Sequence, residues 1–199
     1  MDFKNKLKEA QALIESKNEA QAITVLNEAL NQLKENPPSD LSQENQLEIE
    51  IEIQEYLGDI MSSQNKYQEA LSHLLMSITQ FETIRSISPD IDHEFLFRIY
   101  QKIATAFEKL GQQFESEKYL RKAGEIKAIV VKKELTRKFM DAGYKVEQNV
   151  RPIPTEQQPI DFIAEKGSMI KKTRIAVWFA LDEAEIDTIS FLIKGYDKY

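Results

Sequence analysis

Only a few residues of this chain have the types and spacing that catalysis or metal binding would require. The 199 residues include no cysteine, which excludes a disulfide framework, a thiolate nucleophile and a cysteine-based zinc site. The two histidines, His73 and His93, are 20 residues apart and have no further ligand pattern beside them. The sequence holds no glycine-rich phosphate loop and no serine elbow. Carboxylates are therefore the main candidates for chemistry.

Two sets of carboxylates in the last third of the chain are candidates for a metal site. Asp161 opens an apolar segment, but Mg²⁺ is usually held by two or more carboxylates with waters or phosphate. A strand cap and a partner for a lysine are the other interpretations of Asp161. The second set is Asp182, Glu183, Glu185 and Asp187. Its spacing is typical of a capping box at a helix N-terminus. We therefore expect no metal site and no cofactor.

Basic residues gather once along the chain, shortly before and after residue 140. The candidate nucleic-acid contacts in this cluster are Lys132, Lys133, Arg137 and Lys138, followed by Lys145 and Arg151. A solvated helix face is the alternative interpretation. It is the preferred one, because the cluster is small and the chain has a net charge of -7.

The charge of the chain divides into two parts. Residues 1–130 carry 22 acidic and 14 basic side chains, whereas residues 131–199 carry 11 and 12. This shift indicates two domains with different surfaces, and the acidic first part is a poor general binder of phosphate backbones. No apolar leader follows the N-terminus, and the longest apolar runs are too short to span a bilayer. We expect a cytoplasmic protein without membrane contact.

The elements that must position these residues begin with a series of helices. Apolar spacing predicts helices over about residues 3–14, 22–33, from 41–44 to 62–65, 67–87, 92–110 and 114–129. The segment 47–53 alternates with period two, which alone would indicate a strand. Helix is preferred there because Ile49, Ile53, Leu57 and Ile60 continue at helical spacing.

Small residues recur where consecutive helices of a pair would touch. The clearest copy has Gly58 and Ala70, and equivalent small positions fall at Ala29, Ser77 and Ala123. This pattern resembles the tetratricopeptide family, whose units are antiparallel helix pairs, over about residues 3–128. The spacing between the equivalent positions is 48 and 46 residues, whereas the family period is about 34. The resemblance implies stacked helix hairpins with longer helices or connections.

Family members bind ligands against the first helix of each pair. The resemblance implies that the partner-binding residues are Glu52, Glu55, Asp59, Arg98, Gln101 and Glu108. Carboxylates at the centre of such a groove favour a protein or peptide segment that is basic. The alternative is that these side chains form merely solvated helix faces.

The pattern changes beyond about residue 129. A further helix is predicted over 135–143, followed by strands at 144–150, 160–164 and 174–181 and a last helix from 182. This order, with Gly143-Tyr144-Lys145-Val146 after the helix and Pro159-Ile160-Asp161 opening the second strand, resembles the restriction-endonuclease-like PD-(D/E)xK nucleases.

The nuclease resemblance implies a role for Asp161 and the loss of the other active residues. Asp161 matches the metal-binding acid at the start of the second strand. Trp178 and Ala180 stand where active members carry the second acid and the lysine. The resemblance therefore implies a degenerate module with no catalytic and no metal-binding residues.

Together these patterns predict a multidomain protein of class α plus α/β. A tetratricopeptide-like domain of stacked antiparallel helix hairpins spans 1–129, and a small α-β-β-β-α module spans 130–199. The expected function is a non-enzymatic protein–protein interaction scaffold that binds a protein segment. One alternative is a nucleic-acid-associated protein with an inactive nuclease-like module. A third is an active metal-dependent nuclease.

Overall fold

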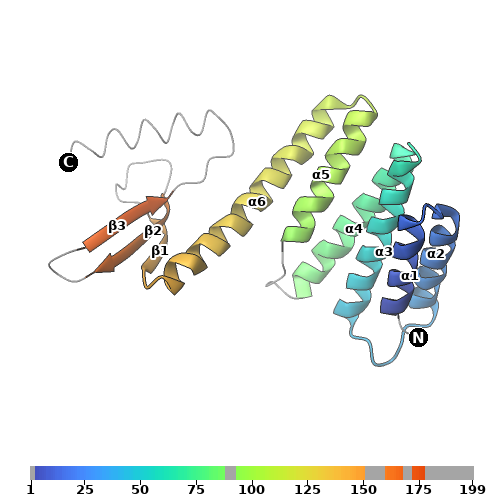
Figure 1. The fold of residues 1–199 in the computed structure, drawn as a ribbon, viewed down its shortest axis with the longest axis horizontal. Helices are drawn as coiled ribbons and strands as arrows, with labels where there is room; N and C mark the ends of the chain where they lie inside the picture. The colour runs from blue at the N-terminus through green and yellow to red at the C-terminus, as the bar shows by residue number, and fades with distance from the viewer. Residues whose placement is uncertain (1–2, 88–92, 151–159, 168–171, 178–199) are drawn as a thin grey trace. The chain divides into compact units, whose positions relative to one another are not determined.

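The computed structural model describes residues 3–87, 93–150, 160–167 and 172–177 (Figure 1). The helices are α1 (Phe3–Glu15), α2 (Glu19–Glu35), α3 (Gln43–Ser63), α4 (Tyr67–Ile87), α5 (Glu94–Lys109) and α6 (Gln113–Asp141). The strands are β1 (Lys145–Val150), β2 (Ile160–Gly167) and β3 (Lys172–Val177). The expectation of a mainly helical chain with a small α/β part near its end is thus confirmed. The hairpin-repeat and nuclease-like assignments remain predictions.

The chain divides into two compact units, residues 1–123 and 124–199. The division falls inside α6, which contributes its first part to one unit and its remainder to the other. We expected one helix to end near Ile129 and another to start near Leu135, and this is wrong. The five residues between these two positions include no Pro or Gly, so nothing interrupts the backbone hydrogen bonds.

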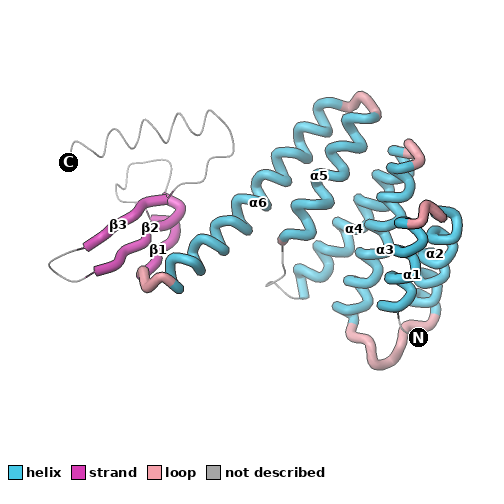
Figure 2. The backbone as a smooth tube through the Cα atoms, viewed as in Figure 1, coloured by secondary structure: helices cyan, strands magenta, loops and turns pink. Residues whose placement is uncertain are grey.

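Short loops, pink in Figure 2, join α1 to α2, α3 to α4 and α5 to α6. These three connections share one turn geometry. The second residue after the end of α1, α3 and α5 has a positive φ, of 60° at Lys17, 60° at Asn65 and 73° at Gly111. In each turn the N–H of the following residue reaches a carbonyl five residues back, as Asn18 does to Leu13. These bonds form the Schellman motif, which satisfies the last carbonyls of a helix and reverses the chain. The second helix of each pair therefore runs back alongside the first.

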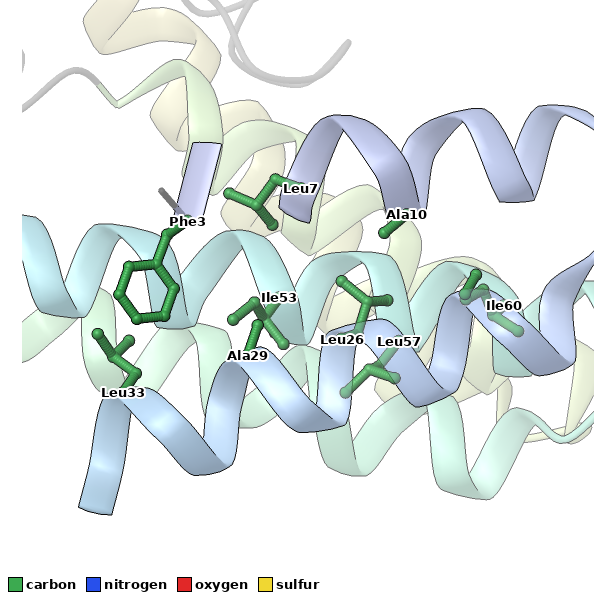
Figure 3. Packing of buried hydrophobic residues seen from close by; sticks show 10 residues of the cluster. Phe3, Leu7, Ala10, Leu26, Ala29, Leu33, Ile53, Leu57 and Ile60 are labelled. Carbon is green, nitrogen blue, oxygen red and sulfur yellow. The ribbon is translucent and has the colours of Figure 1, made fainter. Parts of the chain in front are cut away.

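Helix α3 is at the centre of the first unit. Its residues Ile53, Leu57 and Ile60 join side chains of α1 and α2 in one buried cluster, shown in Figure 3. Ile51 is also buried, although it lies outside that cluster. A helix that buries more than one face needs apolar residues at more positions than a single helical stripe supplies. This explains the period-two pattern at 47–53, where the preferred helix is confirmed.

Helices α3 and α4 approach closely at the small residues predicted from the sequence. A Cβ atom added to Gly58 would lie 2.9 Å from the Cγ atom of the buried Leu74. Ala70 is fully buried in the same contact region. The three equivalent small positions, Ala29, Ser77 and Ala123, are all buried as well. The backbones can approach this closely because none of these positions carries a large side chain.

The second unit packs the later part of α6 against a three-stranded antiparallel sheet of order β1-β2-β3. Phe139 of α6 contacts the buried Phe162 of β2 and Tyr144, with ring centroids 5.6 and 5.3 Å apart. Strand β2 continues to Gly167, which pairs with Lys172, although we expected this strand to end at residue 164. The predicted last helix from Asp182, and the positions of Trp178 and Ala180, lie outside the described residues.

Candidate functional site

The site is built on two helices of the first unit, α3 and α5. Glu52, Glu55 and Asp59 follow one another along α3 at intervals of three and four residues, so they share one face of that helix. Arg98 and Lys102 are four residues apart on α5 and share a face for the same reason. Because Arg98 contacts Glu55 and Lys102 contacts Asp59, the two helices run in the same direction.

Ion pairs join the two helices at this place. The Arg98 Nε and Nη2 atoms donate to the two carboxylate oxygens of Glu55 at 2.6 and 2.8 Å. Lys102 Nζ donates to Glu55 Oε1 at 2.7 Å and to Asp59 Oδ2 at 2.6 Å. The Glu55 side chain is only 10% exposed, and burying such a charge is costly unless it is paired and hydrogen-bonded. Arg98 and Lys102 supply that pairing.

An open pocket of about 190 Å³ lies at the same position. Its described lining residues are Glu52, Glu55, Tyr56, Asp59 and Arg98, and we call it the α3–α5 pocket. Ligand and cofactor sites usually measure about 300–1,000 Å³. The α3–α5 pocket is therefore of a size for one side chain of a partner rather than for a whole cofactor.

Protonation behaviour differs among the three carboxylates of the pocket. Burial, followed by the charge of Glu55, raises the pKa of Glu52 above its usual value. Burial also raises the pKa of Asp59, and the hydrogen bond from Lys102 offsets only part of that effect. Burial would raise the pKa of Glu55 too, but the hydrogen bonds from Arg98 and Lys102 outweigh it and lower that pKa.

The structure brings together four of the six partner-binding residues predicted from the sequence: Glu52, Glu55, Asp59 and Arg98. The other two, Gln101 and Glu108, are exposed on α5 and are not among the described lining residues of the pocket. Sequence reasoning missed Tyr56 and Lys102. Lys102 was detectable, because the i, i+4 pair Arg98 and Lys102 matches the spacing of Glu55 and Asp59.

The predicted basic cluster belongs to the second unit and is only partly free for a partner. Lys132 is half-buried and donates to Asn149 Oδ1 at 3.0 Å and to Asp161 Oδ1 at 3.3 Å. Lys138 pairs with Glu134 at 2.6 Å on the same helix. Lys133 and Arg137 are exposed. The cluster therefore offers a solvated helix face, with Lys132 directed to β1 and β2.

Asp161, the candidate metal-binding acid, thus has a lysine as its ionic partner. This is one of the two alternative interpretations that the sequence left open for it. Across the part of the chain that the structure describes, no group of three or more His, Asp or Glu side chains is arranged to hold a metal ion. None of the helices described is both long enough and apolar enough to cross a membrane.

No family model matches this chain, and no curated protein matches it.

Proposed function

We propose that this protein is a non-enzymatic scaffold that binds a segment of another protein on the face formed by α1, α3 and α5. The observation that carries the proposal is the gathering of Glu52, Glu55, Asp59 and Arg98 in one open pocket on that face. Arg98 and Lys102 of α5 hold Glu55 and Asp59 in place by ion pairs, and the pocket is open to solvent. Binding is reversible and needs no cofactor.

A basic partner segment fits the electrostatics of this face. Three carboxylates of the pocket face two cations, Arg98 and Lys102, so one negative charge remains locally in excess. The unit as a whole is acidic, which attracts a basic segment over a longer range. Lys4 of α1 also acts on Glu52 and lowers its pKa, so the excess is weaker toward α1.

Charge reversal at Glu52 tests this proposal. The pocket desolvates part of the Glu52 side chain, but the residue as a whole is exposed and accepts no hydrogen bond within the described parts of the chain. Glu52→Lys should therefore fold normally while repelling a basic segment. The matched control is Glu82→Lys, because Glu82 is exposed on α4 and does not line the pocket. Each tagged protein is used to capture binding proteins from the native host. Proteins that bind the wild type and Glu82→Lys but not Glu52→Lys would support the proposal.

Equal capture by all three proteins would overturn the proposal.

Retention of nucleic acid that falls steeply with salt and depends on Lys133 and Arg137 would favour the alternative of a nucleic-acid-associated protein. The structure offers less for that alternative, because two of the four predicted contacts, Lys132 and Lys138, already pair with carboxylates.

A further inference from the structure

Three carboxylate oxygens of the α3–α5 pocket still have room for a hydrogen-bond donor. Both oxygens of Glu55 and Oδ2 of Asp59 accept from Arg98 and Lys102. Within the described residues, Asp59 Oδ1 and both oxygens of Glu52 accept no hydrogen bond. A partner with several donors and a positive charge would satisfy all three.

The guanidinium of Arg98, which lines the pocket, is a group with several donors and a positive charge, and its contacts show how such a group is bound there. The Arg98 guanidinium lies side-on against Glu55 with two parallel hydrogen bonds, and its Cζ atom is 5.6 Å from the centre of the Phe95 ring. The guanidinium is thus held by a carboxylate and an aromatic ring together. The unfilled part of the pocket offers the same two components, Glu52 and Tyr56.

We infer that the α3–α5 pocket receives the guanidinium of one arginine side chain of the partner, bound by Glu52 and Asp59 beside the ring of Tyr56. This inference rests on the proposed function and makes it more specific. A guanidinium suits the pocket better than an ammonium, because its planar fork donates to a carboxylate through two parallel bonds and stacks on aromatic rings. The volume of about 190 Å³ admits a single side chain.

The occupant is an arginine of a partner protein rather than a free metabolite. The pocket is small and open, and its described lining encloses no apolar body of a ligand. A free amino acid would also bring a carboxylate into a pocket with an excess negative charge, whereas an arginine within a chain carries none.

Titration of the full chain with N-acetyl-arginine methylamide, followed by NMR, tests the inference directly. The backbone amides of residues 52–59 and the Arg98 Nε–H report on the pocket. We expect saturable shifts with the arginine derivative, at least threefold weaker binding of the lysine derivative, and no saturable shift with the neutral citrulline derivative.

Two variants assign these shifts to the pocket. Glu52→Gln should weaken the arginine derivative at least fivefold, since it removes the charge that makes the hydrogen bonds strong. Glu48→Gln is the matched control, because Glu48 is exposed on the same helix and does not line the pocket.

Equal binding of the arginine and citrulline derivatives, or equal binding by Glu52→Gln and wild type, would overturn the inference. Absence of any shift up to the solubility limit would overturn it too. The proposed function is judged separately: if host proteins are lost with Glu52→Lys while the arginine derivative does not bind, the scaffold proposal stands and the arginine pocket is wrong.

Discussion

At the scale of single residues, Glu55 is the position on which the pocket depends. It is a buried carboxylate whose charge is balanced by two side chains from another helix. Removing one partner of such a group leaves its charge only partly compensated, which costs more than the intact pair contributes. Reversing Glu55 itself would therefore damage the fold and would not be a clean test of binding.

Arg98→Met should lower the free energy of unfolding by roughly 1–2 kcal/mol. This loss of stability is smaller than the full cost of breaking a buried ion pair, because the Arg98 side chain is 54% exposed and Lys102 still contacts Glu55. Urea denaturation measures the change. The control Arg85→Met breaks an exposed pair with Glu82 and should stay within about 0.5 kcal/mol of wild type. Equal effects of the two variants would show that the α3–α5 pairs are dispensable.

Glu52→Gln should leave stability at neutral pH unchanged or raise it by up to about 0.5 kcal/mol. The pKa of Glu52 is raised in the folded protein, so its ionised form disfavours folding above that pKa, and the penalty disappears as the pH falls below its usual value of 4.5. The stability of the two proteins should therefore converge near pH 4. Denaturation curves at neutral and acidic pH give the comparison, and a clear loss of stability in Glu52→Gln at neutral pH would contradict the assignment.

The pKa of Glu55 is lowered, so its own contribution has the opposite sign. Stability from Glu55 is fully present above its usual pKa of 4.5 and is lost as the pH falls through the lower folded value. This separates the roles of the two residues: Glu55 supports the fold, whereas the charge of Glu52 is compensated only in part, by Arg98 and Lys4. Perturbed carboxylates in a pocket are a common property of functional sites.

At the scale of elements, the helices could be predicted and their ends only in part. Apolar spacing located each of the six helices in the described part of the chain, and the small residues Gly58 and Ala70 correctly indicated the contact between α3 and α4. The turns at Lys17 and Asn65 were harder to recognise, because the left-handed position that favours glycine carries another residue. The continuity of α6 was missed since a change of pattern was mistaken for the end of a helix.

Ala70→Leu should destabilise the protein by roughly 1–3 kcal/mol, because the larger side chain would overpack the contact between α3 and α4. The neighbouring variant Glu69→Leu, at an exposed position of the same helix, serves as control. It should change the free energy of unfolding by less than about 0.5 kcal/mol. A similarly small effect of Ala70→Leu would mean that the helices are less closely packed there.

Lys17→Gly should stabilise the protein by roughly 0.5–1 kcal/mol. Lys17 has a φ of 60°. This φ is unfavourable for a residue with a Cβ atom but not for glycine. The greater freedom of glycine in the unfolded chain keeps the gain small. Thermal and urea denaturation can measure it. The adjacent Ser16→Gly should not stabilise, and a gain there equal to that of Lys17→Gly would refute the conformational explanation.

At the scale of the whole molecule, the sequence predicted the surfaces better than the pairs between them. The four predicted residues that meet in the pocket were implied by the tetratricopeptide resemblance, and intervals of three and four residues put three of them on one face of α3. That Arg98 and Lys102 neutralise Glu55 and Asp59 depends on how the helices pack, which composition does not specify. The same holds for Lys132, which belonged to a basic cluster in the sequence and pairs with Asp161 in the fold.

The proposed binding of a protein segment to the face around the α3–α5 pocket can be tested by site-specific photo-crosslinking. A photoreactive residue replaces exposed Gln101 on α5 in one protein and exposed Met76 on α4 in another, and both are expressed in the native host. We expect a discrete protein adduct from position 101 that is absent from position 76 and is lost with Glu52→Lys. Adducts of equal yield from both positions, or an adduct from position 101 that persists with Glu52→Lys, would contradict it.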